Sequence, residues 1–305
     1  MVNMELHYLK LFHAVASFLS LSRAAEELHI SQPAVSIQIK KLEEEIGLKL
    51  FERKGRQVYL TQSGIILYRY TTKIFDLVGQ ATAELYSLKG TIWGKVQVGA
   101  SNTPGIYIMP RILGKYKKKY PDVVTNLHVK TTYEIENMLY QNQLDFAIMG
   151  GGVSREDIFN LEKLMVDEVI LAVSPENPLA QRGIVTAEEL IKEQYITHEH
   201  NSALFRLVEN IVEELGLPFT VAMSLGSIDA IKQAISYNLG ISFVPRISIE
   251  LELELGLIKE IKIKNKEWKY PYYLVHHKGK QFAPAVEKLI ELCKKELKEM
   301  GGKNN

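Results

Sequence analysis

Apolar residues near the start of the chain recur at helical spacing. Steps of three and four place them on one helical face, and they are Leu6, Leu9, Phe12, Ala16 and Leu19. After a break at residues 20–22, Ser22 is the expected N-cap of a short helix over residues 23–28. A tight turn follows, and Ser31 is the expected N-cap of a third helix in which Pro33 fits the first turn.

The third helix has an apolar back and a polar, basic front. Its core-facing positions are Val35, Ile39, Leu42 and Ile46. Two short strands over residues 50–53 and 57–60 form a hairpin with a basic tip. A helix of this kind fits the DNA major groove, although the pattern alone fits a merely solvated basic face equally well. The candidate DNA contacts are Ser31, Gln32, Pro33, Ser36, Ile37, Lys40, Arg53, Lys54 and Arg56.

Residues 61–89 contain no proline and carry one narrow apolar stripe. Its members alternate steps of four and three, namely Leu67, Thr71, Ile74, Val78, Ala81, Leu85 and Leu88. A helix of ~28 residues would be a rod of about 42 Å. Packing on its own domain is the alternative, but a surface helix then usually has a wider stripe. We expect a dimer through this linker helix, with contacts from Leu67, Ile74, Val78 and Leu85.

Strand and helix patterns alternate after residues 90–94. The expected strands cover residues 95–100, 126–130, 144–149, 169–173 and 240–244. The expected helices cover residues from about 101 to 120, 133–140, 204–215 and 228–237. This alternation predicts an α/β fold with mainly parallel sheets covered by helices on both faces.

Ligands of such sheets lie beyond the carboxyl ends of the strands, near helix N-termini. Four loops at that level are rich in hydroxyl and amide side chains, which also serve as helix caps. The candidate effector-binding residues are Ser101, Asn102, Thr103, Thr131, Thr132, Asn201, Ser202, Gly226 and Ser227. Because these loops contain no arginine, they suit a small anion or a small polar metabolite.

Length and composition add limits to this picture. A chain of 305 residues is long enough for two or three domains, and 46% hydrophobic residues is ordinary for a globular protein. The net charge is only +1, so DNA binding needs a local basic surface. The single Cys293 excludes an intrachain disulfide and zinc fingers. No segment is apolar enough for a membrane span, and the start does not resemble a secretion signal, so we expect the cytoplasm.

Enzyme motifs are missing from the sequence. There is no Gly-x-Ser-x-Gly elbow, no phosphate loop and no His-Glu-x-x-His helix, and we expect no cofactor. Residues 150–152 form a glycine run that we interpret as a flexible turn. His198 and His200 share one strand face but lack a third ligand in evident spacing, so we expect a surface role and no metal. An enzyme on a binding-protein-like fold is the less favoured alternative.

Residues 22–36, SRAAEELHISQPAVS, closely resemble the helix-turn-helix signature of LysR-type transcriptional regulators. Residues 40–53 continue the match and residues 60–64 close the wing in the same manner. One departure is Ile37, where many members have an arginine. Isoleucine can contact a thymine methyl but cannot make a bidentate bond to guanine.

The resemblance extends to the effector-binding domain of that family. It rests on residues 99–103, 144–148, 225–227 and 239–245, while residues 201–205 depart from the family's pattern. Residues 99–103 are also similar to relatives concerned with sulfur or carbon assimilation. The resemblance implies a winged helix-turn-helix over 1–60, a linker helix over 61–89 and a periplasmic-binding-protein-like effector domain over 90–305. Its lobe I would span 94–166 plus 268–300, and lobe II 167–267.

The resemblance also implies partners and a mechanism. It implies a sequence-specific transcription regulator, a homodimer or a tetramer, that binds double-stranded DNA at two-fold-related sites. RNA polymerase is a candidate partner. Effector binding would close the lobes and change the angle between the DNA-binding heads. A nucleoid-type protein that binds DNA without an effector is an alternative, but it would not need the two-lobed domain.

Overall fold

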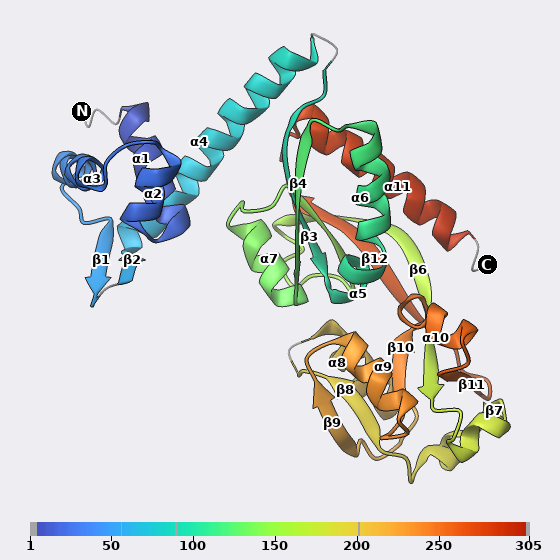
Figure 1. The fold of residues 1–305 in the computed structure, drawn as a ribbon. Coiled ribbons are helices and arrows are strands. Elements are labelled where there is room, and N and C mark those ends of the chain that lie inside the picture. The colour runs from blue at the N-terminus through green and yellow to red at the C-terminus, as the bar shows by residue number, and fades with distance from the viewer. Residues whose placement is uncertain (1–4, 56, 89–90, 201, 303–305) are drawn as a thin grey trace. The chain divides into compact units, whose positions relative to one another are not determined.

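The computed structural model describes residues 5–55, 57–88, 91–200 and 202–302. They fall into two compact units, Met1–Lys89 and Gly90–Asn305, whose elements are labelled in Figure 1. The first unit contains α1 (Leu6–Phe18), α2 (Leu21–Glu27), α3 (Gln32–Ile46), β1 (Phe51–Lys54), β2 (Gln57–Leu60) and α4 (Gln62–Ser87). The antiparallel β1–β2 hairpin follows directly on α3, so this unit, hereafter the head, is a winged helix-turn-helix.

The core of the head is built from the apolar faces that the sequence predicts. Phe12 of α1, Ala24 of α2 and Val35 and Leu42 of α3 are all fully buried together. Ser31 is confirmed as the N-cap of α3, because its hydroxyl accepts the N–H of Ala34. The prediction for α2 is wrong: Ser20, with an extended backbone, caps this helix, and Ser22 lies inside it.

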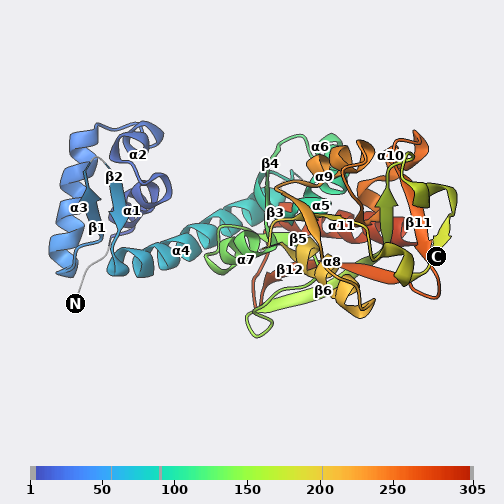
Figure 2. The ribbon, with the colours of Figure 1, turned by 90° about the horizontal axis from the view of Figure 1, so that it is seen from below.

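The linker helix α4, drawn as one long ribbon in Figure 2, differs in burial between its two halves. Its first half packs on α1, where Leu67 contacts the core of the head and Thr71 is fully buried. Farther along, Val78 is 48% exposed and Leu85 is 65% exposed. The apolar stripe predicted as one seam therefore serves the head's own core in its first half, whereas Val78 and Leu85 of its second half are exposed.

The second unit alternates strands and helices. Its first part contains β3 (Gly94–Ser101), α5 (Asn102–Tyr107), α6 (Met109–Lys119), β4 (Val123–Lys130), α7 (Thr132–Tyr140), β5 (Phe146–Gly150) and β6 (Phe159–Val173). Then follow η1 (Pro178–Gln181), β7 (Ile184–Val185), η2 (Ala187–Leu190), β8 (Tyr195–His198), α8 (Ala203–Glu214), β9 (Val221–Leu225) and α9 (Ile228–Ser236). It ends with β10 (Ser242–Pro245), η3 (Arg246–Ser248), α10 (Glu250–Glu254), β11 (Lys259–Ile263), β12 (Trp268–His277) and α11 (Pro284–Gly301).

The main sheet has the order β4-β3-β5-β12-β6-β11-β7, with β10 paired to β6. The prediction of mainly parallel sheets is wrong for its centre, where β12 runs antiparallel to both β5 and β6. The strand β6 is also much longer than the predicted residues 169–173. Its first part pairs with β12, and its end pairs with β10 and β11, so one strand passes from the lobe of β3–β5 (lobe I) into the lobe of β8–β10 (lobe II).

Helices cover both lobes, as Figure 1 shows for α6 and α11 on lobe I and for α8 and α9 on lobe II. The helix expected from residue 101 to about 120 is broken at Ile108, which separates α5 from α6. Cys293 is fully buried in α11, in the large core that runs through the second unit. Among the described residues, no helix combines the length and apolarity that a membrane crossing needs.

Candidate functional site

The outer face of α3 carries the predicted base-reading residues. Gln32 and Pro33 are exposed at the start of the helix, and Ser36 is half-buried one turn later. Ile37 is 68% exposed, an unusual position for a β-branched apolar side chain. The helix therefore presents one apolar contact among small polar groups.

Cationic side chains flank this face. Lys40 is exposed and pairs loosely with Glu44 of the same helix at 3.7 Å. On the hairpin, Arg53 is exposed and Lys54 lies 3.3 Å from Glu52. Such solvated pairs are weak and leave both lysines able to contact phosphate. The predicted contact Arg56 lies outside the described residues.

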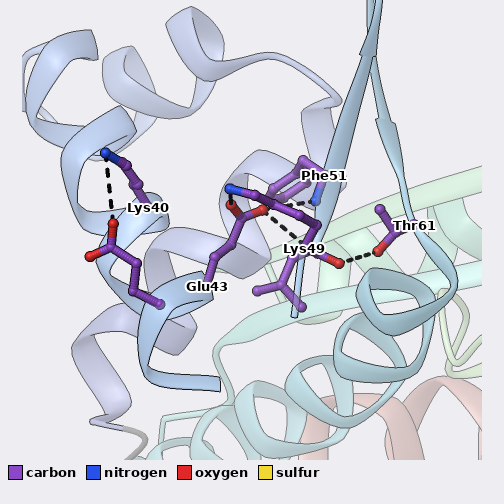
Figure 3. Close-up of polar contacts among 7 residues, drawn as sticks. Lys40, Glu43, Lys49, Phe51 and Thr61 are labelled. Carbon is purple, nitrogen blue, oxygen red and sulfur yellow. Dashed lines mark hydrogen bonds and ion pairs between the residues drawn. The ribbon is translucent and has the colours of Figure 1, made fainter. Parts of the chain in front are cut away.

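A buried carboxylate holds the hairpin against α3 (Figure 3). Glu43 is 8% exposed, and it accepts the backbone N–H groups of Leu50 at 2.8 Å and Phe51 at 3.2 Å. Lys49 Nζ lies 2.6 Å from its other oxygen. This fixes where the wing begins relative to the recognition helix. The sequence shows only a run of three glutamates, and nothing in it marks Glu43 as the buried one.

A pocket in the second unit gathers residues from both lobes. Its cavity volume is about 20 Å³, roughly the room of one water molecule. The lining residues predicted from the sequence are Ser101, Asn102, Thr103, Thr131, Thr132 and Ser202. They come from the ends of β3 and β4 in lobe I and the start of α8 in lobe II, which the chain separates by up to a hundred residues.

Several of these hydroxyls already have structural partners. The oxygen of Ser101 accepts the N–H of Gly150 at 3.0 Å, while Thr131 and Ser202 cap α7 and α8. Thr103 and Thr132 differ: both are more than nine-tenths buried and line the pocket, and neither side-chain hydroxyl has a hydrogen-bond partner within the described part of the chain. Their hydroxyls are free to bind a ligand.

Two further lining residues were not predicted. His198 is 2% exposed and lines the pocket, so the expectation of a surface role for it is wrong. Its Nδ1 accepts the N–H of Glu199 at 2.9 Å, and burial lowers the pKa of the imidazole. The neutral ring therefore carries its proton on Nε2, which lies 3.3 Å from the amide of Asn102.

Tyr270 of β12 forms another wall of the pocket. A Cβ atom added at Gly150 would come within 2.4 Å of its ring, so glycine is what lets the ring pack over this backbone. The glycine run 150–152 thus has a packing role besides its turn, since Gly151 and Gly152 have positive φ angles. No sequence signal indicated Tyr270.

The remaining predicted effector residues do not line the pocket. Ser227 caps α9 by accepting the N–H of Ala230, and the neighbouring Ile228 faces the pocket instead. Gly226 lies against Glu199. Asn201 lies outside the described residues.

The pocket is lined without any Lys, Arg, Asp or Glu side chain among the described residues. The helices α7, α8 and α9 begin at it, and their first N–H groups carry partial positive charge. Neutral donors and helix N-termini suit a small anion or a polar molecule. Within the described chain, no cluster of three His, Cys, Asp or Glu residues suits a metal ion.

A larger hollow lies elsewhere, between β6 and the β11–β12 segment of lobe II. Its Arg246 is already paired with Glu168 and Glu260. No predicted binding residue lines it. The pocket between the lobes, which gathers predicted residues from both, is therefore the better candidate for ligand binding.

Comparisons with known proteins match both units of the chain. A family model described as "Bacterial regulatory helix-turn-helix protein, lysR family" matches residues 6–65, and one described as "LysR substrate binding domain" matches residues 90–298. The RuBisCO operon transcriptional regulator of Allochromatium vinosum is 32% identical over 299 residues, which cover 98% of each chain. A probable RuBisCO transcriptional regulator of Chlorokybus atmophyticus is 36% identical and covers 85% of each chain.

Solved structures share the fold. Full-length OxyR of Pseudomonas aeruginosa superposes with a TM-score of 0.78 at 20% identity, covering 97% of this chain and 95% of its own. CbnR in complex with its target DNA superposes with a TM-score of 0.66 at 21% identity, covering 96% of this chain and 100% of its own. The Synechocystis CcmR regulatory domain in complex with 2-PG superposes with a TM-score of 0.63 at 24% identity, covering 68% of this chain and 99% of its own.

Proposed function

This chain belongs to the LysR family of transcriptional regulators, and from that premise we propose that it controls genes of carbon dioxide fixation. As a member it is an effector-controlled DNA-binding regulator and not an enzyme. The choice of genes is supported by relatives named as RuBisCO regulators, which are similar along almost the whole chain. We also propose that it acts in the cytoplasm.

The DNA contacts divide into two groups by their chemistry. Gln32, Ser36 and Ile37 face outward near the start of α3 and would read base edges, with Pro33 shaping the entry of the helix. Lys40, Arg53 and Lys54 would contact phosphates. The exposed half of α4, with Val78 and Leu85, would pair with a second copy and so present two heads to two-fold-related sites.

The single observation that carries the effector site is the meeting of predicted loops from both lobes in one pocket. The hydroxyls of Thr103 and Thr132 would hold the ligand, together with the paired side chains of His198 and Asn102. A small anion fits these donors. Because the similar CcmR domain is named as a complex with 2-PG, 2-phosphoglycolate is the first effector to test.

DNase footprinting tests the regulated genes. The full chain should protect two half-sites upstream of the RuBisCO genes of its own genome, and an unrelated promoter should stay unprotected. Protection of DNA without sequence preference would favour the nucleoid-type alternative and contradict the proposal.

Isothermal titration of the full chain tests the effector, with 2-phosphoglycolate as the probe and glycolate and inorganic phosphate as comparisons. Binding should be lost in a Thr103→Val/Thr132→Val double variant, which keeps the shape of both side chains. The matched control is Thr82→Val on α4, which belongs to the first unit and does not line the pocket. Equal binding by the double variant and the parent would remove the pocket as the effector site.

A further inference from the structure

A second polar contact joins the two lobes away from the effector pocket. The hydroxyl of Tyr107, the last residue of α5 in lobe I, donates a hydrogen bond of 2.7 Å to Asp229 Oδ1 in α9 of lobe II. The ring of Tyr107 also packs against the apolar core of lobe II. One half-buried side chain of lobe I thus packs on the other lobe and is hydrogen-bonded to it.

A buried lysine completes this contact. Lys232 of α9 is 8% exposed, and its Nζ lies 4.8 Å from the centre of the Tyr107 ring. The same nitrogen is 3.2 Å from Asp229 and 2.9 Å from Glu252 of α10. A desolvated cation over an aromatic face is attracted to it, and the two carboxylates hold the cation in place.

The charges of this cluster support one another. Burial alone would lower the pKa of Lys232, but the contacts with Tyr107, Glu252 and Asp229 outweigh it and raise that pKa. The hydrogen bond from Tyr107 lowers the pKa of Asp229. At neutral pH the cluster is therefore a charged, hydrogen-bonded unit that loses its partner from lobe I if the lobes separate.

Both helices of this contact begin at the effector pocket. α5 starts with Asn102 and Thr103, which line the pocket, and ends with Tyr107. α9 starts with Ile228, which also lines the pocket, and Asp229 follows directly. A movement of one lobe against the other would change the pocket and the Tyr107 contact together.

We propose that Tyr107, Asp229, Lys232 and Glu252 form an interlobe latch that favours the closed arrangement of the second unit before an effector binds. The latch sets the fraction of molecules that are open for ligand entry, because opening must break the Tyr107–Asp229 hydrogen bond and move the Tyr107 ring away from Lys232. The latch does not depend on which effector the pocket takes.

Spin-label distances between the lobes test the latch without any effector. Labels would be placed on the full chain at Arg111→Cys in α6 and Glu209→Cys in α8, both exposed positions, while the native Cys293 is fully buried. Tyr107→Phe removes the hydroxyl and keeps the ring, and Lys232→Met removes the cation. Each should raise the ratio of open to closed molecules roughly tenfold, the usual effect of losing a hydrogen bond to a charged group.

The matched control is Tyr237→Phe, since Tyr237 caps the C-terminus of α9 and is 75% exposed. It should leave the distance distribution unchanged. Hydrogen exchange of α5 and α9 follows the opening equilibrium even where the open form is rare, and it should quicken by the same factor in Tyr107→Phe. If Lys232→Met does not fold, Tyr107→Phe decides alone. The latch would be overturned if Tyr107→Phe had the same label distances and exchange rates as the parent. It would also be overturned if Tyr237→Phe changed them as much as Tyr107→Phe does.

Discussion

His198 of lobe II and Asn102 of lobe I face each other across the pocket, with 3.3 Å between Nε2 and Nδ2. Because the backbone N–H of Glu199 is donated to Nδ1, the proton of the neutral ring lies on Nε2. The side-chain oxygen of Asn102 is then the atom that can accept this proton. The nitrogen and oxygen of a side-chain amide are told apart by their hydrogen-bond partners, so the oxygen is assigned to the position that faces Nε2. A ligand entering here meets one polar group from each lobe.

Removing either partner should weaken effector binding without affecting the head. In titrations with 2-phosphoglycolate, we expect His198→Ala and Asn102→Ala to raise Kd by roughly 10- to 100-fold, the effect of losing a hydrogen bond to a charged ligand. Gel shifts without effector should match those of the parent. His277→Ala, on the last residue of β12, is the control and should bind normally. Unchanged affinity in both pocket variants would show that this pair does not contact the ligand.

Ile37 should read a thymine methyl group. Burying one methyl group contributes about 0.8 kcal/mol, so replacing the contacted thymine by uracil should weaken operator binding by the parent about fourfold. The Ile37→Ala variant should bind both DNAs equally. Lys40→Ala, which removes a phosphate contact, should weaken binding to both by the same factor. Fluorescence anisotropy with operators that carry single uracils measures this, and a parent that binds every uracil operator as well as the original would contradict the prediction.

The exposed half of α4 should hold the dimer together. Leu85 is 65% exposed in the described chain, so Leu85→Glu should leave the fold intact and place a charge in the dimer contact. Sedimentation equilibrium should show at least a tenfold rise in the dimer dissociation constant. Lys73→Glu, an exposed charge change on the same helix, is the control. A Leu85→Glu protein that remains as dimeric as the parent would place the dimer contact elsewhere.

Local periodicity predicted the head well because its helices bury one face each. Val35 and Leu42 follow from the spacing of apolar residues, and Ser31 follows from the chemistry of helix capping. The exception is the cap of α2. Serines stand at both positions 20 and 22, and only the backbone conformation at Ser20 decides between them.

The centre of the second unit could not be predicted in this way. β12 enters the sheet between β5 and β6 from about a hundred residues further along the chain, and no local sequence pattern indicates such a distant partner. The same long-range packing places Tyr270 and His198 in the pocket. The hydroxyl-rich loops were found because strand ends and helix caps have local signatures, whereas a lone histidine or tyrosine acquires its role from its neighbours in space.

The buried Glu43 should be essential to the stability of the head. Glu43→Ala removes the acceptor for the N–H groups of Leu50 and Phe51, and an unsatisfied buried group costs ~1–3 kcal/mol. We expect the head to unfold at a lower temperature in calorimetry of the full chain, while the transition of the second unit stays in place. Glu44→Ala, an exposed neighbour, should change neither transition. A head that melts normally without Glu43 would mean that water or another residue replaces its contacts.

A second buried carboxylate lies where β6 passes between the lobes. Asp167 is 1% exposed and accepts the N–H groups of Glu168 at 2.9 Å and Ile247 at 3.2 Å. Burial raises the pKa of this carboxyl to about 7, against the opposing effect of the two N–H donors and with help from the nearby carboxylates of Glu250 and Glu168. Tyr272 of β12 also lies within electrostatic range, and its own pKa is raised by burial and by the charge of Asp167.

The pKa of Asp167 predicts how stability depends on pH. Since the folded pKa, about 7, is above the ordinary aspartate value of 3.8, the folded state holds the proton more tightly than the unfolded chain. The stability that this group contributes is complete below the unfolded pKa and is lost as pH rises through the folded pKa, by up to about 4 kcal/mol between pH 4 and pH 7. Asp167→Asn stays neutral at every pH, so its denaturation profile should lack this loss.

Urea denaturation at several pH values between 4 and 8 measures the free energy of unfolding. It is carried out on the parent, on Asp167→Asn and on the exposed control Asp157→Asn. The quantity to compare is the slope of the free energy of unfolding with pH. The Asn side chain has one oxygen and cannot accept from both N–H donors, so the substitution should also lower stability by an amount that does not depend on pH. The parent and Asp157→Asn should lose stability relative to Asp167→Asn as the pH rises toward neutrality. Parallel profiles for all three proteins would mean that Asp167 is ionised throughout, with its charge stabilised by the two backbone N–H groups.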